Sequence, residues 1–400
     1  MSASAPVMSN PTSTQRIVRQ LTRPTEVDVT VLASVQDYPC VSVLLNTRPS
    51  SRMTAEDRSR LESLIRQVRA RLVMEGVDPS GRIHEQLVWA AAILADSPTD
   101  RSVALFASSS MVEYRHLAVS VDERQIIDPT FATRDLVRSL QESPDYMLLV
   151  LDSDSARLFR SSSGALRERT DGLFPVVRES AEETGQRRRP GRRRGAKAGR
   201  RDNREREQSL AFQRQVDRAL EKEMSQGPVP VIVMAGDRVL SDFLSVTSSS
   251  GRVIGFARNA GGRLDLRRLE RTVRPLLSDH LADLEAAARD TMDAGIPGRG
   301  VVTGLAACWH AALAERPELL LVEESFAIPA RVSRDGMLVH PLSLAERELP
   351  GVIDDIVDDL VESVIARGGQ VRFVPDGSLA GSDRVALRVA YSWRGRRRRR

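Results

Sequence analysis

Length, composition and charge narrow the class of protein. The chain has 400 residues, 41% of them hydrophobic, and this length predicts two or three globular domains rather than one core. The two cysteines, Cys40 and Cys308, are too few for a disulfide framework or a CxxC metal site, so a reduced, cytoplasmic setting is expected. The longest apolar run, from Leu87, is about half a bilayer span, so no membrane segment is expected.

The basic residues gather in two short stretches, although the net charge is only +5. Residues 187–206, the basic loop, carry eleven basic residues, and residues 394–400, the arginine tail, carry six arginines. The rest of the chain is therefore acidic. Stretches rich in Arg and Gly bury little apolar area and seek phosphate. We interpret the basic loop as a polyanion-binding element, with solvated charge as the alternative.

The first predicted domain covers residues 27–130 and follows a disordered segment, 1–26. Its hydrophobic pattern changes between the strand and helix periods, which indicates a mixed α/β domain. Thr54 is the predicted N-cap of its first long helix. In chain order, we expect a strand over 40–45, helices over 54–72 and 83–95, and extended segments over 102–108 and 111–121.

The second predicted domain covers residues 131–277 and alternates strands with helices, which predicts a sheet covered by helices. The basic loop is an excursion from this domain, between a hairpin and a long helix. In chain order, we expect a helix over 133–145, strands over 146–152, 156–162 and 165–170, a helix over 204–224, a strand over 229–236, a helix over 237–246, a strand over 252–257 and a helix over 264–294.

The third predicted domain covers residues 278–393 and precedes the arginine tail. A helix is expected over 353–365, apolar on one face and acidic on the other. Gly368 and Gly369 follow where a helix needs a left-handed stop, and Gln370 opens a strand. Gly-Gly-Gln is the catalytic tripeptide of class-one peptide-chain release factors, but its setting here predicts a helix cap. The acidic face carries Asp354, Asp355, Asp358, Asp359 and Glu362.

The order of these parts resembles a known family. The stretches that carry the resemblance are YPCVSVLLNTRP (38–49), IIDPTFATRDLVRSL (126–140), YMLLVLDSDSARLFR (146–160) and DDLVESVIARGGQVRFV (358–374). Over about residues 38–393, the chain resembles the bacterial, Balon-like relatives of archaeal and eukaryotic release factor one and of Pelota. The resemblance implies three α/β domains, each a mixed sheet with flanking helices. The central domain is then RNase H-like and the C-terminal domain L7Ae-like.

The resemblance places a release factor's catalytic Gly-Gly-Gln on a loop that enters a long basic helix of the central domain. The matching positions are Gly195 to Lys197 or Ala198 to Arg200, and neither contains a glutamine. We therefore expect no peptide release and no catalytic residue. Pelota and Balon-type hibernation factors imply a different activity, which is to occupy the ribosomal A site in rescue or hibernation.

The predicted function is a cytoplasmic, ribosome-associated translation factor that acts as a monomer without cofactor or metal. Its partners would be ribosomal RNA and, by resemblance, a translational GTPase such as elongation factor Tu, for which the acidic face is the candidate surface. The alternatives are a peptidyl-tRNA hydrolase or nuclease, and a general RNA-binding stress protein. Arginine forks bind phosphates bidentately. The RNA-binding residues are predicted to be Arg187, Arg188, Arg189, Arg192, Arg193, Arg194, Lys197, Arg200, Arg201 and Arg204.

Overall fold

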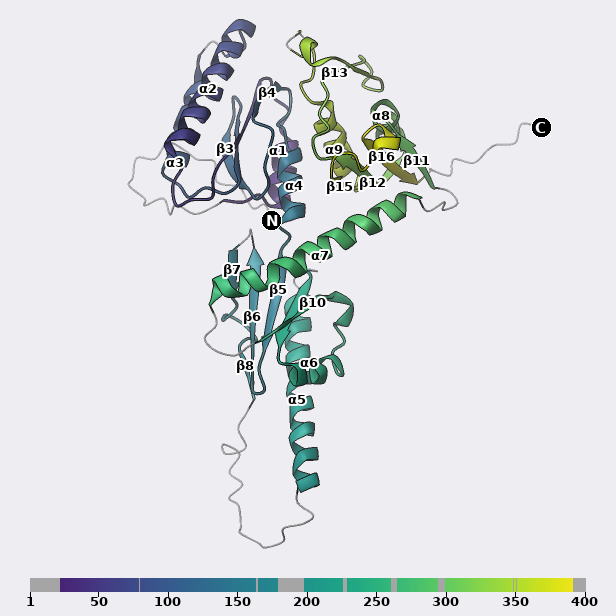
Figure 1. The fold of residues 1–400 in the computed structure, drawn as a ribbon. Helices are drawn as coiled ribbons and strands as arrows, with labels where there is room; N and C mark the ends of the chain where they lie inside the picture. The colour runs from purple at the N-terminus through teal and green to yellow at the C-terminus, as the bar shows by residue number, and fades with distance from the viewer. Residues whose placement is uncertain are drawn as a thin grey trace, which may run out of the picture. The chain divides into compact units, whose positions relative to one another are not determined.

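The chain forms two compact units of mixed α/β structure (Figure 1). The computed structural model describes residues 22–78, 80–162, 165–178, 198–225, 229–259, 265–293, 299–347, 349 and 351–390. The first unit comprises Met1–Pro24 and Thr30–Ala132, and the second comprises Thr25–Val29 and Thr133–Arg400. Sheets flanked by helices occur in both units, which confirms the predicted fold class.

The first unit contains a four-stranded antiparallel sheet in the order β3-β2-β1-β4. Alternate side chains of β1, including Val41, Val43 and Leu45, are fully buried against two helices. Thr54 caps the first of these helices as predicted, because its side chain accepts a hydrogen bond from the Asp57 amide. The elements are α1 (Glu26–Ala33), β1 (Cys40–Asn46), α2 (Ala55–Glu75), α3 (Arg82–Ala95), β2 (Ser102–Ala107), β3 (Val112–Leu117) and β4 (Arg124–Asp128).

The second unit begins with a short helix and the central sheet, whose strand order is β10-β9-β5-β6-β7, with β8 paired to β6. Strands β5, β9 and β10 run parallel, and the residues of β5 and β9 are buried on both faces, whereas the edge strand β10 is partly exposed. The elements are α4 (Arg134–Glu142), β5 (Tyr146–Leu151), β6 (Ser155–Ser162), β7 (Ala165–Glu168), β8 (Val176–Val177), α5 (Ala198–Met224), β9 (Val231–Ala235), α6 (Asp237–Leu244), β10 (Val253–Arg258) and α7 (Leu266–Asp293).

Helices cover both faces of the central sheet. On one face, Phe212, Val216 and Leu220 of α5 and Phe243 of α6 join the buried core. On the other face, the first half of α7 packs through Leu269 and Val273. Helix α7 is continuous through residue 278, and its second half contacts the next sheet through Ala288.

The third sheet has the strand order β11-β16-β12-β15. Helices α8 and α9 pack on it and on each other, and a small hairpin of β13 and β14 lies beside them. The elements are β11 (Arg299–Thr303), α8 (Leu305–Ala314), β12 (Arg316–Glu323), β13 (Ala330–Val332), β14 (Val339–Pro341), α9 (Ile356–Ala366), β15 (Gln370–Val374) and β16 (Val385–Ala390).

Helix α9 is shorter than the sequence predicts, since it begins at Ile356 rather than at residue 353. Two local interactions set this start. The backbone of Ile353 exchanges hydrogen bonds of 2.9 and 3.0 Å with Ala330, which holds it extended, and the Asp355 carboxylate accepts a hydrogen bond from the Val357 amide as an N-cap. The apolar periodicity runs through residue 353 regardless, so the pattern alone places the start too early.

Candidate functional site

The basic loop lies between the central sheet and the long helix α5. Strand β8 ends at Val177 and helix α5 begins at Ala198. The predicted RNA-binding residues from Arg187 to Lys197 lie outside the residues that the structure describes, whereas Arg200, Arg201 and Arg204 fall within the first two turns of α5. The helix thus begins inside the basic loop, six residues before the predicted start at 204.

Helix α5 carries the end of the loop away from the sheet. Its first buried side chain, among those described, is Phe212, and the preceding part of the helix projects beyond α6 and the strands (Figure 1). No acidic residue occupies the first turn, where the helix dipole is positive. Arginines in these turns therefore repel the helix end, and an anion bound there would relieve the repulsion.

A polar seam fixes the packed half of α5 against α6 and the segment that follows it. The Ser209 hydroxyl donates to Asp242 over 2.8 Å. Two turns later, the buried Asp217 carboxylate accepts hydrogen bonds from the Thr247 hydroxyl (2.6 Å) and the Ser248 amide (3.0 Å). The spacing places these contacts on one stripe of the helix. They set the rotation of α5 about its axis, and with it the direction of the projecting end.

The Gly-Gly-Gln tripeptide is a helix stop, which confirms the interpretation from the sequence. Gly368 has φ +79° after the last residue of α9, and Gln370 is the first residue of β15, paired with Leu319. A Cβ atom at Gly369 would lie 2.6 Å from a methyl carbon of Val364, so the second glycine is required by close packing. This junction of helix and strand lacks the extended loop that a catalytic probe needs.

The acidic face of α9 is not a solvated or docking surface, which corrects the interpretation from the sequence. Asp354, Asp355 and Asp358 are 1%, 2% and 6% exposed. They lie inside the unit because helix α4 supplies cations to this face. Arg134, only 1% exposed, forms a 3.1 Å ion pair with Asp355, and its backbone amide donates to Asp358 over 2.6 Å.

Other polar side chains of α4 bind neighbouring parts of the second unit. Arg138 pairs with Asp135 on its own helix (2.7 Å) and with Glu324 after β12 (3.3 Å). The Gln141 side chain accepts from the Phe373 amide and donates to the Val371 carbonyl of β15. We call these contacts, with Thr133, Arg134 and the α9 carboxylates, the α4–α9 network. The sequence analysis missed it; its signal is the mixture of arginine and aspartate on a short helix beside an acidic one.

Glu362 is the group with the most perturbed protonation in this network. Burial and the neighbouring Asp358 charge raise its pKa to about 9, while a 2.8 Å hydrogen bond from the Thr133 hydroxyl lowers it in part. Glu362 therefore holds a proton at neutral pH.

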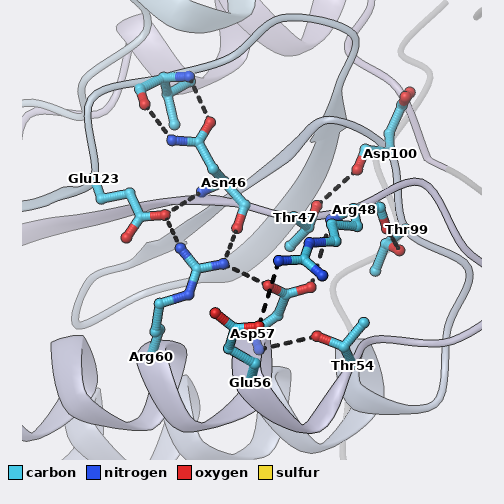
Figure 2. A network of polar contacts seen from close by, with 11 residues as sticks. Asn46, Thr47, Arg48, Thr54, Glu56, Asp57, Arg60, Thr99, Asp100 and Glu123 are labelled. Atoms are coloured by element: carbon cyan, nitrogen blue, oxygen red, sulfur yellow. Dashed lines mark hydrogen bonds and ion pairs between the residues drawn. The ribbon is translucent and has the colours of Figure 1, made fainter.

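The first unit has its own polar network, at the junction of β1 and α2 (Figure 2). Arg60 of α2 pairs with both Asp57 and Glu123 and donates to the Asn46 carbonyl over 3.0 Å. The Asn46 side chain in turn donates to the Val121 carbonyl and accepts from its amide. We call this the β1–α2 network. It holds the turn after β1, from which Arg48 projects with a 75% exposed side chain.

The buried carboxylate of the β1–α2 network, Asp57, is compensated by Arg60. Burial alone would raise the pKa of Asp57, but hydrogen bonds from Thr54 and Arg60 bring it below its ordinary value. The carboxylate is therefore ionised at neutral pH and committed to its partners, which makes it a poor general base.

The β5–β6 turn carries two carboxylates, the type of side chain with which a nuclease would bind metal ions. Asp152 and Asp154 are both exposed, and Asp152 accepts a 3.0 Å hydrogen bond from Asn259. Among the described residues, no group of three His, Cys, Asp or Glu side chains could hold a metal ion. None of the helices described is long and apolar enough to cross a membrane.

Comparison with known proteins finds a family whose sequence model matches part of this chain. Residues 145–316 match the sequence model of bacterial archaeo-eukaryotic release factor family 3. No curated protein matches the chain.

Solved structures with similarity to the chain include three of the Pelota type. A ribosome-bound archaeal Pelota, described together with ABCE1, is 14% identical over 93% of this chain and 95% of its own, with a TM-score of 0.41. Saccharomyces cerevisiae Dom34, a translation termination-like factor, is 12% identical over 74% of each chain, with a TM-score of 0.39. Archaeoglobus fulgidus Pelota is 18% identical over 74% of this chain and 80% of its own, with a TM-score of 0.33.

The matched segment contains the central sheet, both flanks of the basic loop, and the helices α5 to α8. It therefore includes the projecting helix end described above. Over residues 145–316, about two fifths of its length, this chain is similar to bacterial archaeo-eukaryotic release factor family 3.

Proposed function

We propose that this protein is a ribosome-associated translation factor that binds the A site through its basic loop and acts in rescue or hibernation without releasing peptide. The observation that carries the proposal is the position of the loop. The segment that matches a release factor family holds the basic loop at the start of its projecting helix, α5. Eleven basic residues stand in the loop, and Gly-Gly-Gln is absent from it.

Phosphate-rich RNA suits this arrangement. Each guanidinium offers paired N–H donors to a phosphate, and the positive end of the helix dipole adds to the attraction. The polar seam fixes α5, and with it the position of the helix start at Ala198 relative to the sheet. A folded RNA surface such as ribosomal RNA can engage many of the arginines at once, whereas a small anion engages only a few.

A GTPase partner such as elongation factor Tu stays a prediction, and it needs another surface than the one first considered. The carboxylates Asp355 and Asp358 are buried against α4, and Asp354 is buried beside Arg347, so they are not offered to a partner protein.

Sedimentation with vacant 70S ribosomes tests the proposal. We expect the full chain to pellet near stoichiometrically at moderate salt, and a variant with Gly and Ser in place of residues 187–206 to stay in the supernatant. The matched control replaces the six arginines of residues 394–400 in the same way, which removes charge outside the family segment. We expect this control to keep most of its ribosome binding.

Two results would contradict the proposal. Equal losses from the loop and tail variants would mean that only total charge matters. Binding of both variants and of the wild type with a log–log salt slope of about −0.7 to −0.9 per phosphate contact, and without preference for ribosomes over other RNA, would indicate a general RNA-binding protein.

A peptidyl-tRNA hydrolase is a second candidate because of one sequence feature beside the loop. Thr184, Gly185 and Gln186 directly precede the first arginine and match Gly-Gly-Gln at two of three positions. If this were a catalytic tripeptide, Gln186→Ala would abolish release of peptide from ribosome-bound peptidyl-tRNA while ribosome binding persisted. The control is Gln208→Ala, at an exposed position of α5. We expect release by neither variant nor wild type.

A further inference from the structure

One face of the third sheet is only partly covered. Helices α8 and α9 pack on one side, where Leu320, Val322 and Leu387 are buried. The other side packs against the second half of α7, through a small core of Leu319, Leu321, Val374 and Ala288, and helix α4 contacts it at the edge strand β15. Polar side chains occupy the remainder of this face.

Strand register brings three of these polar side chains together. On the α7 side, Arg388 of β16 and Gln370 of β15 are both paired with Leu319 of β12. One step along the same face, Arg372 of β15 is paired with Leu321. Residues distant in sequence thus form one polar row across three adjacent strands.

The row lines a cavity of about 470 Å³ between α7 and the sheet. Three arginines and one carboxylate line it, which makes the cavity cationic. Its charged and amide side chains are Arg316, Arg372, Arg388, Glu318 and Gln370.

The three arginines differ in what they bind. Arg388, 5% exposed, pairs with Glu318 over 3.3 Å and donates to the Thr291 carbonyl of α7. Arg372 is half-buried and Arg316 is exposed, and neither side chain forms a hydrogen bond or an ion pair with the residues that the structure describes. Glu318, the one carboxylate that lines the cavity, is therefore already paired with Arg388.

Arg372 also borders a smaller cavity of about 270 Å³, which contains carboxylates. They are Glu142, Glu285 and Glu324, and among the described residues no ion pair joins any of them to Arg372. Glu324 is held by Arg138 over 3.3 Å, and Glu285 pairs with Arg289 along α7. Burial without a charged partner lowers the pKa of Arg372, a sign that its guanidinium is desolvated and uncompensated. An uncompensated cation of this kind destabilises the fold, and an anion beside it offsets that cost.

We propose that the cavity between α7 and strands β12, β15 and β16 is a phosphate-binding site, in which Arg372 and Arg316 hold the phosphate oxygens and the Gln370 amide adds a neutral donor. Two guanidinium forks fit the tetrahedral oxygens of phosphate better than a single carboxylate. The volume admits a nucleotide or one nucleotide unit of an RNA strand. This site is separate from the basic loop and does not depend on the proposed function.

Calorimetric titration of the full chain with inorganic pyrophosphate, ATP and a twelve-nucleotide RNA tests the site. The key variant is Arg372→Gln, which removes the charge and keeps a polar side chain. The control is Arg193→Gln in the basic loop. We expect Arg372→Gln to weaken pyrophosphate binding about tenfold or more, as loss of a charge-assisted hydrogen bond predicts, and Arg193→Gln to leave it unchanged. A parallel loss with ATP identifies a nucleotide as the source, and a loss with the RNA identifies a strand.

Thermal unfolding without phosphate gives a second, opposite readout. Because Arg372 is an uncompensated cation, Arg372→Gln should raise the unfolding temperature in phosphate-free buffer and reduce the further rise that pyrophosphate produces. The proposal is overturned if Arg372→Gln lowers the unfolding temperature without ligand, since the arginine would then be a structural contact. It is equally overturned if the variant binds all three probes as the wild type does.

Discussion

The β1–α2 network of the first unit and the α4–α9 network of the second both place carboxylates beside arginines. The two networks differ in how many carboxylates face each arginine. In the first, Arg60 and Arg48 face Asp57, Glu56 and Glu123 across a partly open junction. The second is buried, and its two α4 arginines face more carboxylates than they can neutralise. Those carboxylates are Asp135, Glu324, Asp355, Asp358 and Glu362.

The difference shows when a buried carboxylate is neutralised by a bound proton because no arginine is left to neutralise it. In the β1–α2 network, where two arginines face three carboxylates, the pKa of Asp57 lies below its ordinary value. In the α4–α9 network, the pKa of Glu362 is raised to about 9. Both are carboxylates near arginine, so the residue type alone does not decide the charge. The local count of cations, together with burial, decides it.

The largest effect is expected from Arg134→Ala. The substitution leaves Asp355 buried without its ion-pair partner, while the backbone hydrogen bond to Asp358 persists, and should lower the free energy of unfolding of the second unit by about 3–5 kcal/mol. Urea unfolding monitored by Trp309, with Trp89 and Trp393 replaced by Phe, isolates this unit. The control Arg48→Ala removes an exposed pair and should change stability by less than about 0.5 kcal/mol. Equal losses in the free energy of unfolding from Arg134→Ala and Arg48→Ala would contradict the proposed difference between the two networks.

A smaller effect of opposite sign is expected from Glu362→Gln. The folded state binds this proton more tightly than the unfolded state, so its contribution is complete below about pH 4 and is lost as pH rises toward 9. One such proton gives a slope of at most about 1.4 kcal/mol per pH unit. The glutamine should remove this decline, so the variant becomes more stable than wild type at pH 8. Parallel stability curves from pH 5 to pH 8 would refute the raised pKa.

The smallest effect is expected from Asp57→Asn. Loss of the charged acceptor should lower the stability of the first unit by about 1–3 kcal/mol at pH 7. Because the folded pKa is depressed, this contribution is present above about pH 4 and disappears as pH falls further. The measurement is urea unfolding followed by Trp89. Asp96→Asn, which alters the exposed pair with Arg52, is the matched control and should change stability little.

Local features of the fold could be predicted from the sequence. The helix start at Thr54 and the stop at Gly368 depend on a few neighbouring residues, and the structure confirms both. The start of α9 was predicted wrongly because it depends on Ala330, which lies more than twenty residues away. The same limit applies to the acidic face, because its partner Arg134 is separated from Asp358 by 224 residues.

The two candidate sites, the basic loop and the phosphate-binding cavity, differ in the same way in how far the sequence predicts them. The basic loop is visible as composition, since its charges are consecutive. The phosphate-binding cavity is not, because Arg316, Arg372 and Arg388 stand on three strands and meet only through sheet register. An unpartnered arginine looks like any other arginine in a sequence. Only the positions of all its neighbours show that it lacks a carboxylate.

The length of helix α5 has a mechanical consequence. Its first eleven residues precede Ser209, the first residue of the seam, and span about 16 Å at 1.5 Å per residue. A coil of that length would be flexible. The helix is stiff instead, and the polar seam fixes its base. Force on the arginines at the start of α5 is then transmitted through the helix to the central sheet as torque. A partner that binds the basic loop would therefore also orient the domain that contains this sheet.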